Sequence, residues 1–244
     1  MAAPPGHRLF ARYVHTPNSL GYCGPADAAA LEAVACGHDA DGGIEGLARK
    51  FTGAWPYQQL IAELSGVADP LDERVGRAYW TGNELTEQID GVEFGRLLLA
   101  RFAPQAAHYW KYLTDGLLDE AAPTHIFHVL GIYPWTRLLN SSTPEAVHVL
   151  DSCRIAPATV VGVGPDEVVV REQRLEFDGR LSIGAEQDRS VRYRVPEGKF
   201  VGELDRGDLV AIHWDFVCDR LSAEQGERLT YWTRWQCERT NRRL

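Results

Sequence analysis

The sequence changes character near residue 153, and this change constrains the fold more than any other feature. Before it, apolar residues such as Leu60, Ile61 and Leu64 recur at spacings of three and four, which indicates helices. The same spacing recurs at Phe94, Leu97 and Leu98. After it, short β-branched runs are separated by Gly, Pro and Asp, which indicates short strands. We therefore predict an α+β fold, with a mainly helical domain at 1–145 and a β-domain at 146–244.

The β-domain is expected to be a small OB-like barrel that ends in a helix. Several short strands broken by turn residues are typical of such barrels. The final helix is expected after Ser222, because Gln225 follows three residues later and completes a capping box. The expected strands cover residues 159–163, 168–171, 175–177, 191–195 and 209–213.

Two boundaries in the helical domain follow from turn and cap residues. A helix is expected from Pro25 to Cys36 with Gly37 as its C-cap, because proline suits a first turn and glycine a helix end. A short helix is expected from Pro144 to about Leu150, and it would deliver the chain to Cys153.

Charge and composition limit the partners and the compartment. The 244 residues carry a net charge of -9, which argues against nucleic-acid binding because phosphate contacts need a basic surface. No apolar run is long enough to span a membrane. The five cysteines are widely spaced and odd in number, which is typical of a reducing compartment. We therefore expect a cytoplasmic protein that binds neither nucleic acid nor membranes.

Two segments carry most of the functional signal. Cys153 begins the run Cys-Arg-Ile-Ala-Pro-Ala-Thr-Val-Val, and the segment from Gly207 to His213 reads Gly-Asp-Leu-Val-Ala-Ile-His. A thiolate and an imidazole, each at a predicted strand edge, are able to share one transition metal. The plainer alternative is a buried cysteine and a histidine satisfied by backbone. Gly207 and Asp208 are interpreted as turn residues that start the histidine strand.

Together with the Leu-Ser step at Ser222, these segments resemble the HypC-type chaperones of nickel-iron hydrogenase maturation. The resemblance covers about residues 151–240. It implies that Cys153 and His213 hold an iron centre, with cyanide and carbon monoxide ligands in that family. It also implies a carrier rather than an enzyme, with a HypD-like scaffold protein and a hydrogenase large-subunit precursor as partners.

The sequence departs from the HypC pattern in two respects. Cys153 is internal, whereas the family's cysteine follows the initiator methionine, so no free amine is available beside it as a ligand. The stretch between the two segments is also longer than in the family, and an extended hairpin near Phe177–Val195 would absorb the excess. The carrier function and the site at Cys153 and His213 are therefore expectations of the resemblance.

Cys23 offers a second kind of chemistry. It is expected where a helix begins, and a helix N-terminus stabilises a thiolate. The string Cys-Gly-Pro-Ala at residues 23–26 resembles the nucleophile segment of bacteriocin-processing cysteine peptidases. The position of their oxyanion-hole glutamine is Pro17 here, and only Asn18 lies nearby.

A cysteine nucleophile needs a base, for which the candidates are His125, His128 and His148. His125 and His128 would share one face of a helix but point to opposite sides of a strand. The alternative function is therefore a cysteine hydrolase or transferase, with Cys23 as nucleophile and His125 or His128 as base. These histidines are equally able to join Cys23 around a metal or to anchor a core, and the two functions are able to coexist.

Three aromatic clusters lie beside expected turns, at residues 54–57, 79–83 and 132–135. Such clusters are usually packing anchors. We therefore expect them to stabilise the helical domain and to take no part in ligand binding.

Overall fold

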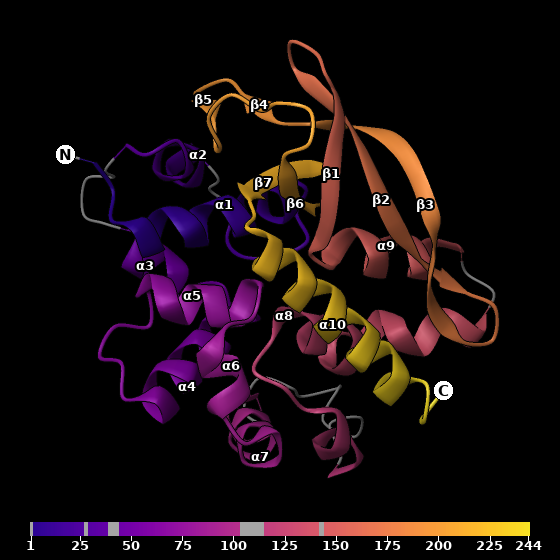
Figure 1. Cartoon of the computed structure of the whole chain (residues 1–244). Helices are drawn as coiled ribbons and strands as arrows, with labels where there is room; N and C mark the ends of the chain where they lie inside the picture. The colour runs from indigo at the N-terminus through magenta and orange to yellow at the C-terminus, as the bar shows by residue number, and fades with distance from the viewer. Residues whose placement is uncertain (1, 27–28, 39–43, 103–114, 142–143) are drawn as a thin grey trace.

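The computed structural model describes residues 2–26, 29–38, 44–102, 115–141 and 144–244. Helices come first along the chain, a five-stranded sheet follows them, and a helix ends the chain (Figure 1). This order confirms the mixed helix and strand composition predicted from the sequence. We call the described residues up to 153 the helical half and those from 156 the strand half.

The helical half consists of mostly short helices. They are α1 (Pro5–Ser19), α2 (Ala29–Ala35), α3 (Glu45–Ala48), α4 (Trp55–Ser65), α5 (Glu73–Trp80), α6 (Glu84–Gln88), α7 (Gly91–Phe102), α8 (His125–Phe127) and α9 (Pro144–Cys153). A π-helical turn, His128–Ile132, continues α8, and 3₁₀ segments cover Asp115–Glu120 and Pro134–Ser141. The apolar periodicity near residues 60 and 97 thus correctly predicted α4 and α7.

Local side chains explain several helix ends. The carboxylate of Asp72 accepts a hydrogen bond from the backbone N–H of Arg74 at 2.8 Å and caps α5. Gly66 ends α4 in the left-handed region, with φ of 65°. The predicted start of α2 was wrong: Pro25 lies outside the helix, which begins at Ala29.

The strand half contains a sheet with the order β1-β2-β3-β7-β6. Its strands are β1 (Ala156–Val163), β2 (Glu167–Phe177), β3 (Leu181–Arg192), β6 (Leu209–His213) and β7 (Phe216–Arg220), and β4 (Arg194–Val195) pairs separately with β5 (Gly198–Lys199). Ala158 of β1 lies opposite Glu172 of β2 on one side and Val210 of β6 on the other. Strand β3 meets β7 at one parallel pair, Arg192 with Phe216.

One detail of the strand half differs from the sequence prediction, and another agrees with it. The expected strands 168–171 and 175–177 are parts of the single strand β2, which a register shift between Gln173 and Leu175 bends without breaking. The predicted hairpin near Phe177–Val195 exists as the pairing of β2 with β3.

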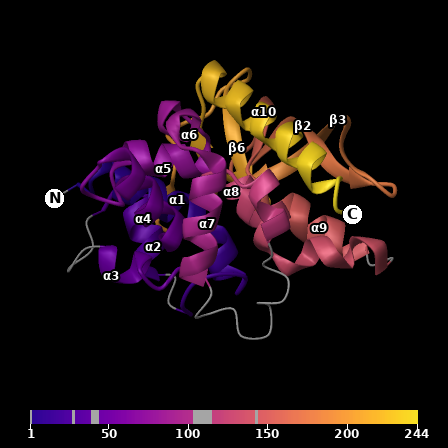
Figure 2. The ribbon, with the colours of Figure 1, turned by 90° about the horizontal axis from the view of Figure 1, so that it is seen from below.

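Helix α10 (Ala223–Thr240) begins as the sequence predicted. Ser222 and Gln225 form a capping box, in which each side chain accepts a hydrogen bond from the other residue's backbone N–H. The helix crosses the junction between the helical half and the sheet, as Figures 1 and 2 both show. Arg228 of α10 forms an ion pair with Glu84 of α6 at 3.2 Å.

The largest hydrophobic core is continuous across the two halves. It contains Phe10, Tyr57 and Phe94 from the helical half, together with Phe216 and Leu229 from the strand half. A smaller core lies among the strands and consists mainly of valines, such as those at 160, 168, 170, 210 and 217. Burial of these side chains holds the halves together.

A buried ion-pair network reinforces this contact. The carboxylate of Asp219 in β7 is 4% exposed and pairs with Arg77 of α5 and with Arg12 of α1, at 3.4 Å for Arg12. The hydroxyl of Tyr13 donates a hydrogen bond to the same carboxylate at 3.4 Å. Strand β7 therefore fixes α1 and α5 at the same point.

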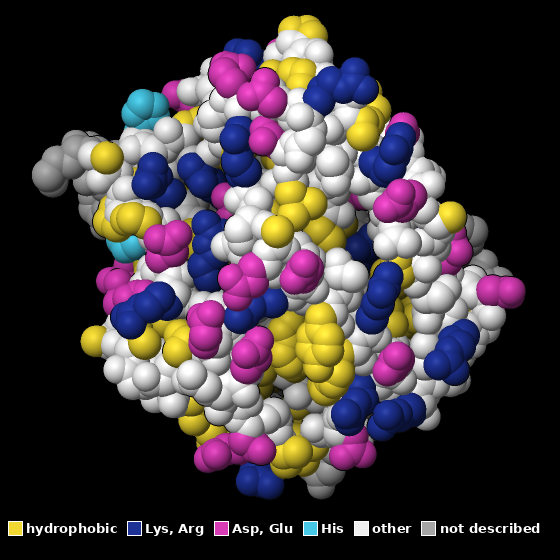
Figure 3. All heavy atoms as spheres, in the orientation of Figure 1, with side chains coloured by type: hydrophobic (Ala, Val, Ile, Leu, Met, Phe, Trp, Pro, Cys, Tyr) yellow, Lys and Arg dark blue, Asp and Glu magenta, His cyan; other side chains and the backbone are white. Residues whose placement is uncertain are grey.

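The surface carries charges of both signs. Figure 3 shows acidic and basic side chains interspersed on the face in the orientation of Figure 1, with a hydrophobic patch beside α10. Tyr231 of α10 is 58% exposed. In the part of the chain that the structure describes, no helix is long and apolar enough to cross a membrane.

Candidate metal-binding cavity

A cavity of about 430 Å³ lies between the two halves. Five of the six candidate residues from the sequence line it: Cys23, His125, His128, Cys153 and His213. The other described lining residues are apolar, aromatic or small and neutral: Val14, Pro17, Gly21, Tyr22, Gly24, Phe51, Thr52, Gly53, Ala54, Tyr79, Trp80, Phe102, Ile132, Tyr133 and Pro134.

Three of these residues form a tight group. One potential ligand atom from each of His125, Cys153 and His213 lies within 4.8 Å of the other two. Ligands of a tetrahedral metal with bonds of 2.0–2.3 Å lie about 3.4–3.8 Å apart, so a small contraction would complete such a site. The structure therefore brings together the cysteine and histidine of the two sequence segments and adds His125 to them.

Cys153 and His213 meet because the sharp turn that follows His213 is hydrogen-bonded to the end of α9. His213 ends β6, as predicted, whereas Cys153 ends α9 and does not lie at a strand edge, so that part of the prediction was wrong. Trp214 and Asp215 follow His213 with positive φ angles of 51° and 58°. The backbone N–H of Trp214 donates to the carbonyl of Ser152 at 2.8 Å, which joins the turn directly to the end of α9.

Positive φ at two successive residues other than glycine is uncommon, and in β-branched or bulky residues it marks strain. At Trp214 and Asp215 the surrounding structure must therefore enforce this conformation. The bond to Ser152 and the pairing of β6 with β7 on either side supply that restraint. The tight turn thus holds His213 beside the C-terminus of α9.

Within the described part of the chain, one ring nitrogen of His213 is free to bind a metal, and the other is held by a hydrogen bond. Its Nδ1–H donates to the carbonyl oxygen of Tyr13 at 2.7 Å, across 200 residues of sequence. Burial lowers the pKa of His213 to about 3, so the ring is neutral near pH 7. Its buried Nε2 therefore bears a lone pair, and it makes no hydrogen bond of acceptable geometry with the described residues. Metal-binding histidines typically show this arrangement, with the second nitrogen donating to a carbonyl.

His125 lies at the start of α8, where the hydroxyl of Thr124 caps the helix. Its Nδ1 lies 3.0 Å from the hydroxyl of Tyr79, and its Nε2 lies 2.9 Å from the carbonyl oxygen of Cys153. Because a carbonyl only accepts, Nε2 carries the proton and Nδ1 accepts from Tyr79. Burial lowers the pKa of His125 to about 4. Binding a metal through Nε2 would require the proton to move to Nδ1.

The thiol of Cys153 is protonated without a metal. Burial raises its pKa to about 12. Its position at the last residue of α9 also places it at the negative end of the helix dipole, which disfavours a thiolate. A bound metal cation reverses this preference, because thiol ligands bind as thiolates and release their protons.

Cys23 lies in the loop between α1 and α2, and the predicted position at a helix start was wrong. Burial raises the pKa of its thiol, and a negative charge on Cys153 would raise it further. The side-chain N–H₂ of Asn18 donates to the carbonyls of Cys23 at 2.7 Å and Pro25 at 2.6 Å. Asn18 therefore organises the loop and does not present that amide to the cavity as an oxyanion donor.

His128 begins the π-helical turn that follows α8, so of the two arrangements considered from the sequence, a helix and a strand, the structure has the helix, and both histidines line the cavity. Its ring centroid lies 6.2 Å from that of His125 and 5.9 Å from that of Tyr133. Burial lowers the pKa of His128 to about 3, and its Nδ1 has no hydrogen-bond partner among the described residues. His148 lies on α9 and does not line the cavity.

The aromatic clusters have a larger role than the sequence indicated. Tyr79, Trp80 and Tyr133 all line the cavity, and Tyr79 also fixes the ring of His125. Tyr57, in contrast, is fully buried and packs against Tyr79, as a packing anchor would. The sequence did contain a signal for this role, because the clusters at 79–83 and 132–135 lie before and after His125 and His128.

Fold and site together define a mixed helix and strand protein with a buried cavity of cysteines, histidines and aromatic side chains. The chain belongs to a family of unknown function, DUF6390, whose model matches residues 2–244. No curated protein and no solved structure gives a significant match. The family match spans the helical and strand halves alike, so both are parts of one family unit.

Proposed function

We propose that the protein binds a transition metal in this cavity and acts as a carrier of an iron centre in nickel-iron hydrogenase maturation. The observation that carries the metal site is the buried Nε2 of His213, which makes no hydrogen bond of acceptable geometry with the described residues. A potential ligand atom of the same ring lies within 4.8 Å of those of Cys153 and His125. A lone pair buried without a partner is costly unless something binds it.

The donors match the metals that a maturation carrier would hold. One thiolate and imidazole nitrogens favour iron, zinc, cobalt or copper over magnesium or calcium. Cys153 would bind as a thiolate, and His213 would bind through Nε2, with Tyr13 fixing its ring. A bound iron ion would supply open coordination positions for small ligands or for a partner's side chain.

The carrier function and its partners rest on the resemblance to HypC-type proteins. In support, the two residues that the resemblance selected, Cys153 and His213, lie in one cavity although 60 residues separate them in sequence. The pairing of β1 with both β2 and β6 also supports the OB-like barrel that the resemblance implies. We propose a HypD-like scaffold and a hydrogenase large-subunit precursor as partners, in the cytoplasm.

The test is anaerobic iron loading of the full chain, followed by a chelator competition. Cys153→Ala and His213→Ala should each weaken iron binding at least about 100-fold, since even outer-shell changes cost 10–100-fold. Cys36→Ala and His15→Gln are matched controls, because both residues lie outside the cavity, and they should bind iron as the wild type does. Wild-type protein that binds no metal would contradict the proposal.

Infrared spectroscopy tests the cargo. The chain would be purified anaerobically from a host that expresses the hydrogenase maturation machinery. Bands in the cyanide and carbonyl stretching region that disappear in Cys153→Ala would support the carrier function. Bound iron without such bands would limit the proposal to metal binding.

The alternative, a cysteine hydrolase or transferase, has less support. Its nucleophile Cys23 has a raised pKa, and the amide of Asn18 is engaged in the loop. His128 lines the same cavity and is neutral, which is the one feature that a base there would need. Rapid alkylation of Cys23 near neutral pH, with Cys153 dispensable, would favour the enzyme over the carrier.

A further inference from the structure

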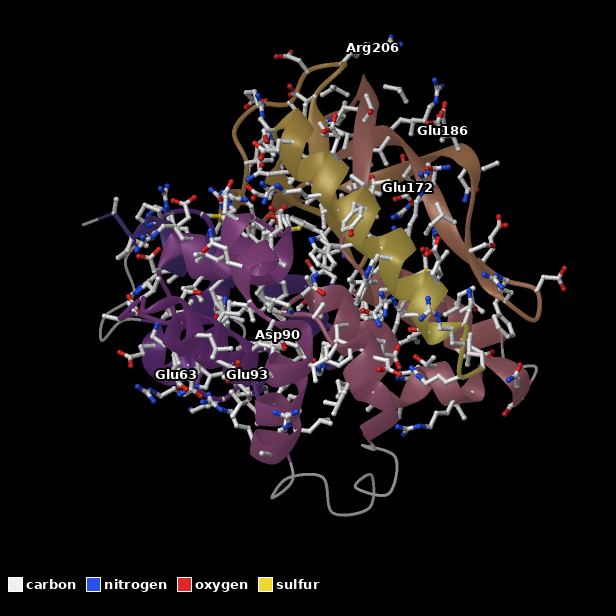
Figure 4. The ribbon with its side chains drawn as sticks, turned by 60° about the horizontal axis from the view of Figure 1, so that its bottom comes forward. Glu63, Asp90, Glu93, Glu172, Glu186 and Arg206 are labelled. Atoms are coloured by element: carbon white, nitrogen blue, oxygen red, sulfur yellow. The ribbon has the colours of Figure 1, made fainter. Side chains whose placement is uncertain are left out.

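The charge of the cavity lining points to a second role for Cys23. Among the described lining residues there is no Asp, Glu, Lys or Arg, so every charge must come from a thiol, a phenol or an imidazole. The acidic residues labelled in Figure 4 lie on the helical half (Glu63, Asp90, Glu93) and on the β2–β3 hairpin (Glu172, Glu186), and none lines the cavity.

This lining sets an electrostatic problem for a divalent ion. One thiolate from Cys153 and neutral imidazoles would leave a net charge of +1 beside the buried side chains of His125 and His213, in a mostly apolar cavity. An uncompensated buried charge is strongly unfavourable. The remaining acids of the lining are the thiol of Cys23 and the phenols of Tyr22, Tyr79 and Tyr133. A thiol is the better ligand, because soft metals select thiolates and deprotonate them on binding.

The loop that carries Cys23 has open space at its Gly21 end and is packed at its Gly24 end. Gly21 and Gly24 flank Tyr22 and Cys23 with φ angles of 78° and 75°. A Cβ at Gly21 would meet no atom within 4 Å, whereas a Cβ at Gly24 would lie 2.3 Å from the ring of Phe51. Tyr22 is 41% exposed and stacks on Trp214, with ring centroids 3.8 Å apart. The loop therefore crosses from α1 to the turn that follows His213.

We propose that Cys23 is a second thiolate ligand, which joins Cys153, His213 and His125 around a divalent ion and makes the loaded site neutral. This inference rests on the proposed metal-binding function and names a further ligand for it. Cys23 is not part of the group within 4.8 Å, so it reaches the ion by an inward shift of its loop. The balance is simple: one M²⁺ enters, two thiol protons leave, and no electron is transferred.

X-ray absorption spectroscopy on the full chain loaded anaerobically with Fe²⁺ alone tests this assignment. The wild type should show two sulfur ligands, and Cys23→Ala should show one. Cys36→Ala is the matched control, because Cys36 is also a half-buried cysteine of the helical half but does not line the cavity, and it should keep two. Proton release on loading should fall from two per metal to one in Cys23→Ala.

The wild-type sulfur count decides the question even if Cys23→Ala does not fold. Two sulfurs support the second thiolate. One sulfur overturns it and leaves the proposed function intact, and it would mean that anionic ligands arriving with the metal balance the charge. A wild-type protein that binds no metal overturns the metal-binding function itself.

Discussion

The two sides of the cavity are built in opposite ways. His213, Cys153 and His125 form a fixed wall, in which each residue ends or begins a regular element and hydrogen bonds join the segments. Residues 20–26 form a loop wall, which the amide of Asn18 and the stacking of Tyr22 on Trp214 hold in place. The proposed carrier would need this combination, because the fixed wall would bind the metal and the loop wall would let it enter and leave.

The largest expected effect concerns the buried ion pairs of Asp219, which join the strand half to the helical half. Asp219→Asn removes the negative charge between Arg12 and Arg77 and should lower the free energy of unfolding by about 3 kcal/mol, since breaking a buried ion pair leaves charges uncompensated. Urea unfolding measures this change. Asp188→Asn, which removes an exposed pair with Arg171, should leave stability unchanged. Equal effects of the two substitutions would show that the Asp219 network does not hold the halves together.

The second prediction concerns the neutral histidines of the fixed wall. Burial lowers the pKa of His213 to about 3 and of His125 to about 4, below the value near 6.5 expected in the unfolded chain. The unfolded state then binds more protons, so metal-free protein should lose stability as the pH falls below about 6.5. The slope should approach about 1.4 kcal/mol per pH unit for each histidine.

Urea unfolding between pH 6.5 and 5 measures this slope, since few ordinary carboxylates titrate there. His213→Gln should show a shallower slope than the wild type, because it removes one buried neutral histidine and retains others, His125 and His128 among them. A wild-type stability that does not change over this range would mean that the two histidines are not buried in the neutral form.

The smallest effect is expected in the loop wall. Tyr22→Ala removes the stacking on Trp214, which is worth about 1 kcal/mol in comparable aromatic pairs, so metal release should become roughly fivefold faster. Stopped-flow transfer of the metal to a chelator measures the rate. Tyr231→Ala is the control, because Tyr231 is exposed on α10 and does not line the cavity. An unchanged rate for Tyr22→Ala would show that the loop does not control release.

The features that sequence could predict were local ones. The capping box at Ser222, the strand that ends at His213 and the helices near residues 60 and 97 all follow from spacing within a few residues. The pairing of β2 with β3 was also expected, as the hairpin that absorbs the extra length between the two segments of the HypC-like pattern. The five residues of chemical interest that line the cavity were identified as well, from their chemistry and their neighbours.

The features that sequence could not predict depend on distant contacts. The carbonyl of Tyr13 that fixes His213 lies 200 residues away, and no local pattern encodes this approach. Cys153 was placed on a strand edge because the β-branched run begins soon after it, whereas α9 continues to that residue. His125 was considered as a base for Cys23 or as a metal ligand beside it. Its closeness to Cys153 depends on a contact between segments 28 residues apart, in which His125 Nε2 donates to the carbonyl of Cys153.

The lining without carboxylates also determines which ions the cavity rejects. Magnesium and calcium need several oxygen ligands, usually carboxylates, and the described lining has none. These two cations are abundant in cells, yet at this site they would lose their water shell and gain little in return. The proposed metal site would therefore favour a scarce soft ion over far more numerous hard ones.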